Sequence, residues 1–188
     1  MSNHLFTADL HLGHQFVAGL RGFDNTADHD RMIIGNLVSD VRENDVLWIL
    51  GDYSVSQHGQ ARALLSQIRC RKILIPGNHD PEHPMHRGAW KAQRTALDTF
   101  EAVLPYQRIR LSKQSFIMSH LPYLLGGDHA SNERYPEYRL PNTGLPLLCG
   151  HVHDAWRFKG NQFNVGVDVN GFKPVKANTV LEWWEVES

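Results

Sequence analysis

Short apolar runs alternate with amphipathic stretches through the first half of the chain. Residues 5–8, 46–50 and 73–75 are apolar runs of the kind that form strands buried on both faces. Between them, residues 28–43 and 59–69 repeat apolar side chains at helical spacing, and residues 86–97 are predicted to form a third helix. This alternation of strands and helices predicts right-handed crossovers in an α/β core.

The second half of the chain is dominated by strand patterns. Residues 108–111 and 115–118 predict a hairpin, and further strands are predicted at residues 145–149, 163–167 and 179–184. We expect these strands to form the other sheet of a sandwich. Residues 122–143 contain three prolines and a Gly-Gly pair with little periodicity, and loops of this length are usually functional or disordered. No internal repeat or domain boundary is visible, so residues 1–188 are predicted to form a single domain.

Composition describes an ordinary globular protein of 188 residues, with 41% hydrophobic and 21% charged residues. The net charge of −1 lacks the basic excess of a general nucleic-acid-binding surface. No apolar stretch is long enough to span a membrane, and the N-terminus lacks a signal-peptide pattern, so a cytoplasmic location without membrane contact is predicted. The two cysteines are expected to be buried free thiols rather than a disulfide.

The twelve histidines are the unusual feature of the composition. Half of them stand in short polar clusters directly after apolar runs: His11, His14, His79, His120, His151 and His153. The others are expected on solvated helices or loops: His4, His29, His58, His83, His86 and His129.

Five apolar runs end in side chains that can bind metal ions. These are Asp9 with His11, Asp52, Asn78 with His79, His120, and His151 with His153. The carboxyl ends of strands in α/β sheets share one rim, so these side chains are expected to meet there. Imidazole, carboxylate and amide ligands suit Mn²⁺, Fe or Zn²⁺. A site for two metals needs a carboxylate that spans both ions, and Asp52 is the candidate; a hydroxide between the ions would be a nucleophile at neutral pH.

In order and spacing, these motifs resemble the full motif series of the calcineurin-like metallophosphoesterases. The series reads Asp9-x-His11, Gly51-Asp52, Gly77-Asn78-His79-Asp80, His120 and Gly150-His151-x-His153. It extends over positions 9 to 153, and residues 7–14 and 164–168 resemble the small single-domain bacterial and phage members. The resemblance implies a four-layer α-β-β-α sandwich, in which two mixed sheets are flanked by helices.

The resemblance also implies roles for individual residues. The first metal would be held by Asp9, His11 and His153, with Asp52 shared; the second would be completed by Asn78, His120 and His151. Mn²⁺ is the expected metal, with Fe, Zn²⁺ or Ni²⁺ as alternatives. His79 would face the substrate, stabilising charge or protonating the leaving oxygen, and Asp80 would orient His79 through a hydrogen bond.

Several further residues have two interpretations. His14 could contact the substrate phosphate or support His11, and Arg21 could reach a phosphate or be solvated. Asp168 could pair with a ligand histidine or serve only in a turn. Because residues 122–143 lie between two ligand segments, they should overhang the metals. Arg134 and Arg139, with the two tyrosines between them, could bind phosphate, stack on a base or pack the loop.

The function implied is a binuclear metal-dependent phosphohydrolase that acts by in-line attack of a metal-bridging hydroxide. A phosphodiester, either a small molecule or a nucleotide, is the preferred substrate because of His79 and because small relatives are often diesterases. A phosphomonoesterase with the same site is the alternative. A DNA-end nuclease is disfavoured by the near-zero charge and the missing accessory domain. A protein-binding scaffold is disfavoured because every ligand position is filled. The oligomeric state stays open.

Overall fold

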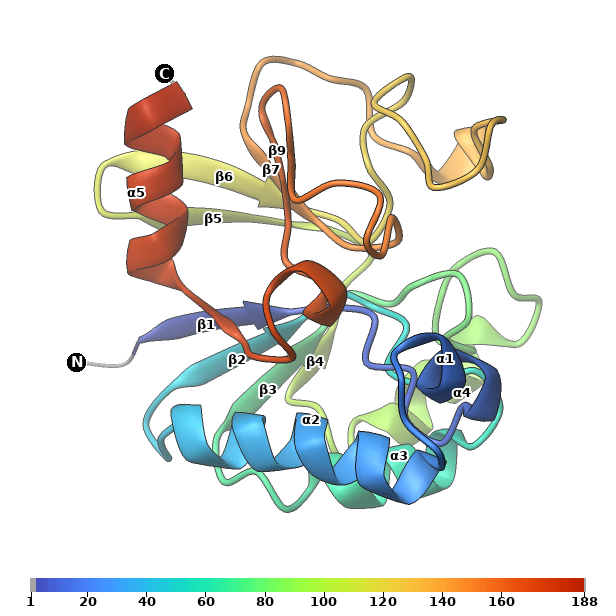
Figure 1. Ribbon diagram of the computed structural model, residues 1–188. Helices are drawn as coiled ribbons and strands as arrows, with labels where there is room; N and C mark the ends of the chain where they lie inside the picture. Colours follow the sequence, from blue (N-terminus) through green and yellow to red (C-terminus); the bar gives the residue numbers. More distant parts are fainter. Residues whose placement is uncertain (1–2, 188) are drawn as a thin grey trace.

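Two five-stranded sheets of mixed direction form the centre of the computed structural model, which describes residues 3–187 (Figure 1). In the first sheet, four parallel strands follow one another in chain order, and a fifth strand pairs antiparallel with β1 at the edge. These strands are β1 (His4–Thr7), β2 (Val46–Ile49), β3 (Arg71–Leu74), β4 (Ala102–Val103) and β10 (Val175–Lys176). The parallel order confirms the strand–helix alternation predicted for the first half of the chain.

The second sheet has the order β5-β6-β7-β9-β8, with three parallel central strands and an antiparallel strand at each edge. Its strands are β5 (Gln107–Leu111), β6 (Gln114–Met118), β7 (Leu147–Cys149), β8 (Phe158–Lys159) and β9 (Gln162–Asn164). The predicted hairpin is β5–β6, and the two sheets together are the mixed α/β sandwich expected from the sequence.

The three predicted helices are present, each shorter than its pattern. They are α2 (Thr26–Asp40), α3 (His58–Leu65) and α4 (Ala89–Ala96). Helix α2 begins where Asn25 caps it, because the Asn25 side chain accepts a hydrogen bond from the N–H of Asp28. A short helix that we did not predict, α1 (Gln15–Leu20), follows His14. Two single turns of 3₁₀ helix complete the set, η1 (Pro136–Tyr138) and η2 (Val167–Val169).

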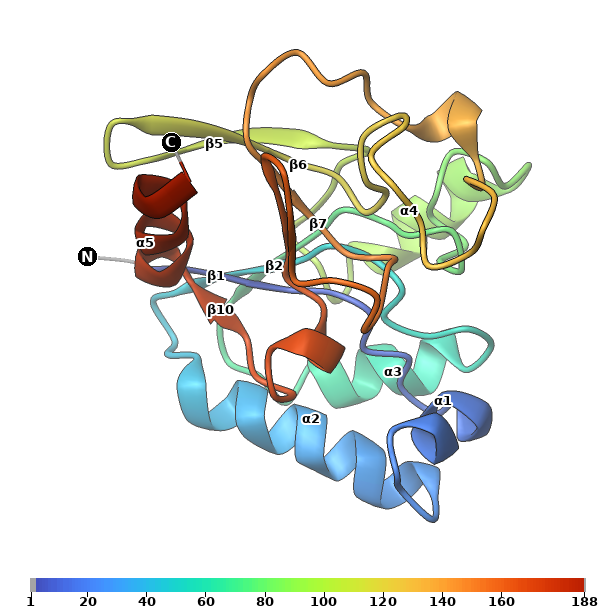
Figure 2. The same cartoon turned by 45° about the horizontal axis from the view of Figure 1, so that its top comes forward.

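Two large apolar clusters hold these layers together. The first packs the outer face of the first sheet against α2 and α3, with Ile33 and Leu37 of α2 in contact with the sheet's core. The second fills the space between the sheets, where Phe6 and Trp48 meet Phe116 and other side chains of the second sheet. Figures 1 and 2 show α2 and α3 beneath the first sheet and the second sheet above it.

The prediction of a strand at residues 179–184 is wrong, because this segment lies within helix α5 (Ala177–Glu187). Val180 and Trp183 are buried in the cluster between the sheets, while Glu182 is exposed. This spacing of three is helical and does not alternate as a strand would. The β-branched and aromatic residues favoured a strand by propensity, but packing of one apolar helix face decided the structure.

The outer face of the second sheet is covered by residues 122–143. Tyr123 and Leu140 of this segment pack against Leu147 and Cys149 of β7, and Trp156 joins them. Within residues 3–187 a helical layer therefore covers the first sheet, whereas a long loop takes the corresponding place on the second. Cys149 and Cys70 are free thiols, as predicted, but only Cys149 is buried and Cys70 is partly exposed. No helix among the described residues has the length and apolar character needed to cross a lipid bilayer.

Candidate metal centre

Every predicted ligand segment follows the carboxyl end of a parallel strand, and the strands of both sheets point to one rim (Figure 1). Asp9, Asp52 and Asn78 follow β1, β2 and β3, whereas His120 and His151 follow β6 and β7. Backbone hydrogen bonds continue between these loops. The N–H of Asp9 donates to Gly51 O at 3.0 Å, and that of Gly150 to His120 O at 3.0 Å. The sheets therefore deliver ligand side chains from both sides of the sandwich.

Five of the predicted ligands have left-handed backbone conformations. Their φ angles are 57° at Asp9, 48° at His11, 54° at Asp52, 72° at His151 and 48° at His153. Non-glycine residues rarely adopt this region, and each such residue costs of order 1–3 kcal/mol unless its surroundings impose it. Concentration of this strain at the rim indicates a site whose geometry the fold enforces.

Two glycines allow the loops to approach one another. A Cβ atom on Gly77 would lie 2.2 Å from Asp52 Oδ1, and one on Gly150 would lie 2.7 Å from Asp9 Oδ2. Neither contact is possible for a larger residue without moving a ligand carboxylate. The glycines of these motifs are therefore required by close approach between chain segments.

Asp9, His11 and His153 form one group of donors, with one atom from each within 4.8 Å of the others. His11 is 2% exposed, and neither of its ring nitrogens has a hydrogen-bond partner within residues 3–187. Buried imidazoles are normally hydrogen-bonded, and an unpaired one costs free energy. A cation bound by Asp9, His11 and His153 would satisfy a nitrogen of His11, so these residues fit the metal that the resemblance implies.

Asp52 lies between this group and a second one. Its Oδ2 atom is 3.9 Å from His11 Nε2 and 3.5 Å from His120 Nε2, and Asp9, Asp52 and His120 also form a compact donor group. Asn78 Oδ1 lies 3.2 Å from His120 Nε2 and 2.9 Å from His151 Nδ1. The side chains predicted to share the second metal are thus in contact, and Asp52 has the central position expected of a shared ligand.

Burial and mutual attraction set the charges of these groups. Burial lowers the pKa of His11 well below its usual range and raises the pKa of Asp9. Burial also opposes charge on Asp52 and His120, but their attraction outweighs it. The pKa of Asp52 is lowered, and that of His120 is raised to about 9.

Hydrogen bonds on the side away from the site orient two of the predicted ligand histidines. His153 Nδ1 donates to Asp168 at 3.1 Å, which leaves Nε2 for the site, and His120 Nδ1 donates to Leu50 O at 2.7 Å. Such contacts fix the tautomer and direction of a ligand imidazole. Of the two interpretations of Asp168, pairing with a ligand histidine is the one found.

Asp80 does not orient His79 as we predicted. Its carboxylate accepts hydrogen bonds from the backbone N–H groups of Asp52, Gly77 and Tyr53, at 2.8, 2.8 and 3.1 Å. These three contacts occupy both oxygens, and no hydrogen bond to His79 is found within residues 3–187. Asp80 instead joins the loops that follow β2 and β3, and so places Asp52.

His79 and His14 remain at the open side of the group. The His79 ring is exposed, 5.8 Å from the ring of His11, and its backbone N–H donates to Asp52 Oδ1 at 2.9 Å. His14 caps α1, since its Nδ1 accepts from the N–H of Val17 at 3.3 Å, and its ring lies 6.1 Å from that of His11. Contact of either residue with substrate stays a prediction.

Two of the arginines predicted to bind substrate make structural contacts. The Arg21 side chain is 4% exposed, donates to both oxygens of Asp168 at 2.7 Å, and reaches Asp9 O at 2.7 Å. Solvation of Arg21 is therefore wrong, and its contact with a phosphate stays a prediction. The Arg139 side chain is fully buried and donates to Asp128 and to backbone carbonyls of the loop, so the prediction that it binds substrate is wrong. Arg134 faces the site, with Nη2 3.3 Å from His151 Nε2.

Sequence reasoning missed two residues that contact the site, Asp128 and His129. Asp128 Oδ2 lies 3.2 Å from His151 Nε2, and His129 Nδ1 donates to His151 O at 2.9 Å. An Asp-His pair after Gly-Gly, between two ligand motifs, was the available signal. The solvated interpretation was also wrong for His29 and His83, which are buried.

The chain is similar in sequence to proteins of two mycobacterial phages. The gene 66 protein of Mycobacterium phage L5 is 38% identical over 186 residues, covering 91% of this chain and 89% of the phage protein. The chain belongs to the gene 66 protein family. Another member, from Mycobacterium phage D29, is 36% identical over 183 residues, with 89% of each chain covered. No protein-family model matches the chain.

Weaker similarities extend to proteins from outside phages. An uncharacterized protein of Methanocaldococcus jannaschii is 24% identical over 179 residues, covering 93% of this chain and 87% of that protein. The crystal structure of a protein of unknown function from Aquifex aeolicus superposes with a TM-score of 0.76 at 22% identity. It covers 97% of this chain and 100% of its own. This likeness shows that the fold is shared.

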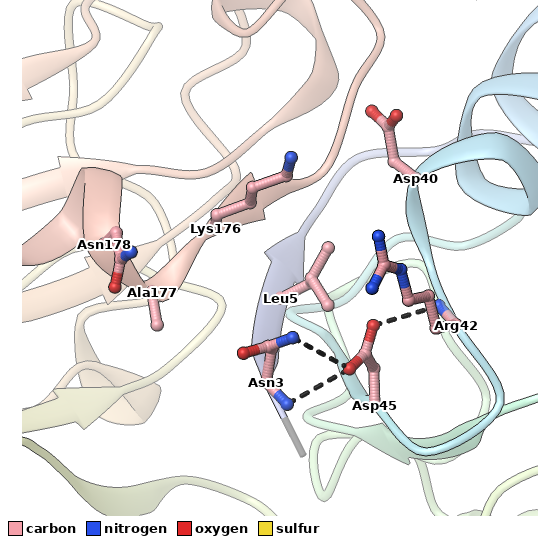
Figure 3. A pocket seen from close by; sticks show the side chains of 8 residues that line it. All are labelled: Asn3, Leu5, Asp40, Arg42, Asp45, Lys176, Ala177 and Asn178. Atoms are coloured by element: carbon pink, nitrogen blue, oxygen red, sulfur yellow. Dashed lines mark hydrogen bonds between the residues drawn. The ribbon is translucent and has the colours of Figure 1, made fainter. Parts of the chain in front are cut away.

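A separate cavity lies at the opposite ends of β1 and β2, far along the sheet from the rim (Figure 3). There the Asp45 carboxylate accepts hydrogen bonds from the N–H groups of Asn3 and Arg42, at 3.1 and 2.9 Å. These contacts tie the start of β1 to the turn after α2. Among the described residues that line this cavity there is no histidine, so it lacks the imidazole donors found at the rim.

Proposed function

We propose that the protein is a binuclear metal-dependent phosphohydrolase with the fold and site of the calcineurin-like metallophosphoesterases. The observation that carries the proposal is the place of Asp52. One oxygen of its buried carboxylate lies 3.9 Å from His11 Nε2 and 3.5 Å from His120 Nε2, between two sets of donors. A shared carboxylate is what a pair of cations requires. Support also comes from His11, whose two buried nitrogens have no partner.

Two groups of residues would each hold one ion, and one carboxylate would bind both. Asp9, His11 and His153 would hold one divalent ion, Asn78, His120 and His151 the other, and Asp52 both. Bound there, two such ions supply charge neutralisation for a phosphoryl group and lower the pKa of water.

The remaining steps belong to side chains at the open edge. His79, exposed beside His11, would donate a hydrogen bond or a proton to the oxygen of the leaving group. Arg134 is partly exposed next to His151 and would pair with a phosphoryl oxygen. Asp80 would act at a distance, by fixing the backbone that carries Asp52.

A phosphodiester remains the preferred substrate class, with a phosphomonoester as the alternative. The test uses protein stripped of metal, reloaded with Mn²⁺ and assayed on paired aryl phosphates, one a monoester and one a diester. The matched control is Asp52→Asn, which keeps the size of the side chain and removes its charge. Faster turnover of the diester by the wild-type protein, lost in Asp52→Asn, would support a diesterase.

The other results are equally informative. Preference for the monoester would keep the site and change the substrate class. If the wild-type protein binds Mn²⁺ and turns over neither compound, the hydrolase proposal fails for this class of substrate. A protein-binding role would then be favoured. Equal turnover by Asp52→Asn would refute the site itself.

A further inference from the structure

The segment 122–143 contacts the second group of donors through one carboxylate. Asp128 Oδ2 lies 3.2 Å from His151 Nε2, on the side of the ring away from Asn78. Asn78 Oδ1 lies 2.9 Å from His151 Nδ1. The two nitrogens of His151 therefore face different partners, one in the loop and one in the site.

Asp128 is held firmly in this position. Its side chain is 1% exposed, and it pairs with the fully buried guanidinium of Arg139. Backbone N–H groups of the same loop also donate to it, from His129 at 2.8 Å and Arg134 at 3.1 Å. Arg139 in turn donates to the carbonyl oxygens of Arg134 and Gly127 at 2.8 and 3.0 Å. The loop is thus folded around the carboxylate that contacts His151.

Which nitrogen of His151 carries the proton depends on this carboxylate. An ionised Asp128 can only accept, so its contact requires Nε2–H on His151. The amide oxygen of Asn78 also only accepts, so its 2.9 Å contact would require Nδ1–H when no ion is bound. His120 donates its Nδ1–H to Leu50 O, so its Nε2 atom is the one that faces Asn78 and an ion. An ion held by Asn78 Oδ1 and the two rings would take the Nδ1 lone pair of His151 and leave Nε2–H for Asp128.

Arg134 offers a competing arrangement. Its Nη2 lies 3.3 Å from His151 Nε2, and a guanidinium would require a lone pair on that nitrogen. The same Nη2 is closer to His129 Nε2, at 2.7 Å. The charge-assisted bond to Asp128 is therefore the one that the geometry favours.

We infer that Asp128 is a positioning residue for the second metal: it holds His151 as the Nε2–H tautomer, so that Nδ1 is the ligand atom and metal binding depends on the folded loop. This inference rests on the proposed function. It makes residues 122–143 part of the metal centre, beyond their role as a cover for the sheet.

The first test observes the His151 ring directly. Long-range proton–nitrogen correlation spectra of the protein loaded with diamagnetic Zn²⁺, assigned with His151→Gln, report which nitrogen of His151 is protonated. Nε2–H is expected. Nδ1–H in the wild-type protein would overturn the inference and indicate that Arg134 controls the ring instead.

The second test compares two variants in Mn²⁺ titrations followed by electron paramagnetic resonance. Asp128→Asn should bind the first ion as the wild type does and the second about 10–100-fold more weakly, the usual effect of losing such a contact. The control is Glu133→Gln, which removes the same charge from the other partner of Arg139, 3.3 Å away, without touching His151. It should leave both affinities within about threefold.

Equal weakening by both variants would reduce Asp128 to a structural part of the loop and overturn the inference. Unchanged binding in Asp128→Asn would do the same. A wild-type protein that binds fewer than two Mn²⁺ ions would instead refute the proposed binuclear function, and the tautomer measurement would still decide the contact.

Discussion

The buried ion pair of Arg21 and Asp168 contacts Asp9 and His153 at the rim, and its loss should lower the free energy of unfolding. The two side chains are 4% and 11% exposed, and Arg21 also donates to the carbonyl oxygen of Asp9. Asp168→Asn removes the charge but keeps one oxygen. Removing one partner of a buried pair costs about 3–5 kcal/mol, and the retained oxygen places the expected loss near the lower limit.

The measurement is urea unfolding of metal-stripped protein, with Glu101→Gln as the matched control. Glu101 pairs with Arg71 at the surface, where the side chains are 47% and 57% exposed, so the same chemical change should cost much less stability. A loss of about 3 kcal/mol corresponds to a fall in Tm of about 6–12 °C for a domain of this size. If Asp168→Asn costs no more than Glu101→Gln, the pair does not support the rim and our reasoning is refuted.

Acid should remove the difference between wild type and Asp168→Asn. Although burial opposes it, hydrogen bonds from His153 and Arg21 hold the pKa of Asp168 below its usual value near 3.8. A carboxyl group with a lowered pKa stabilises the fold above its unfolded pKa, and this contribution is lost as the pH falls through the folded one. The difference should therefore be present at about pH 5 and shrink below about pH 4.

Three further outcomes are expected. His79→Ala should retain both metals but lose hydrolytic rate, most for poor leaving groups, and loss of metal in a binding titration would contradict the role given to His79. Trp183→Ala should cost about 3–5 kcal/mol in urea unfolding, whereas the exposed Val186 should tolerate alanine within about 0.5 kcal/mol, and similar costs would contradict the helical packing of α5. Burial lowers the pKa of His83 to about 4, so the unfolded chain binds this proton more readily than the folded one. The free energy of unfolding should therefore fall from about pH 6.5 towards pH 4. If the difference in this free energy between wild type and His83→Gln does not change with pH, the prediction is contradicted.

Much of the arrangement could be predicted because buried parallel strands have a simple sequence pattern. Continuous apolar runs gave the positions of β1, β2 and β3, and polar residues directly after them marked the rim. The contact of Asp52 with both donor groups follows from that topology. Helix α5 was missed because its aromatic and β-branched residues favour strands, and only packing between the sheets reveals its true period.

Contacts between segments far apart in sequence could not be predicted. The carboxylate of Asp80 turns away from its neighbour His79 because three backbone N–H groups converge on it, two of them from the loop after β2. Arg21 is buried because Asp168, 147 positions later, meets it. Nothing in the local pattern distinguishes such an arginine from a solvated one. For the same reason, the contact between Asp128 and His151 could not be predicted from the sequence.

The donor set is divided between the two sheets, with Asp9, Asp52 and Asn78 on one and His120 and His151 on the other. An ion bound among them would connect the halves of the sandwich, and opening either half would release it. Binding that requires the folded state adds about 2.7 kcal/mol of stability when the free ion is at 100 times its Kd. The lifetime of this protein in a cell would then follow the local supply of metal, so that scarcity would remove the protein as well as its activity.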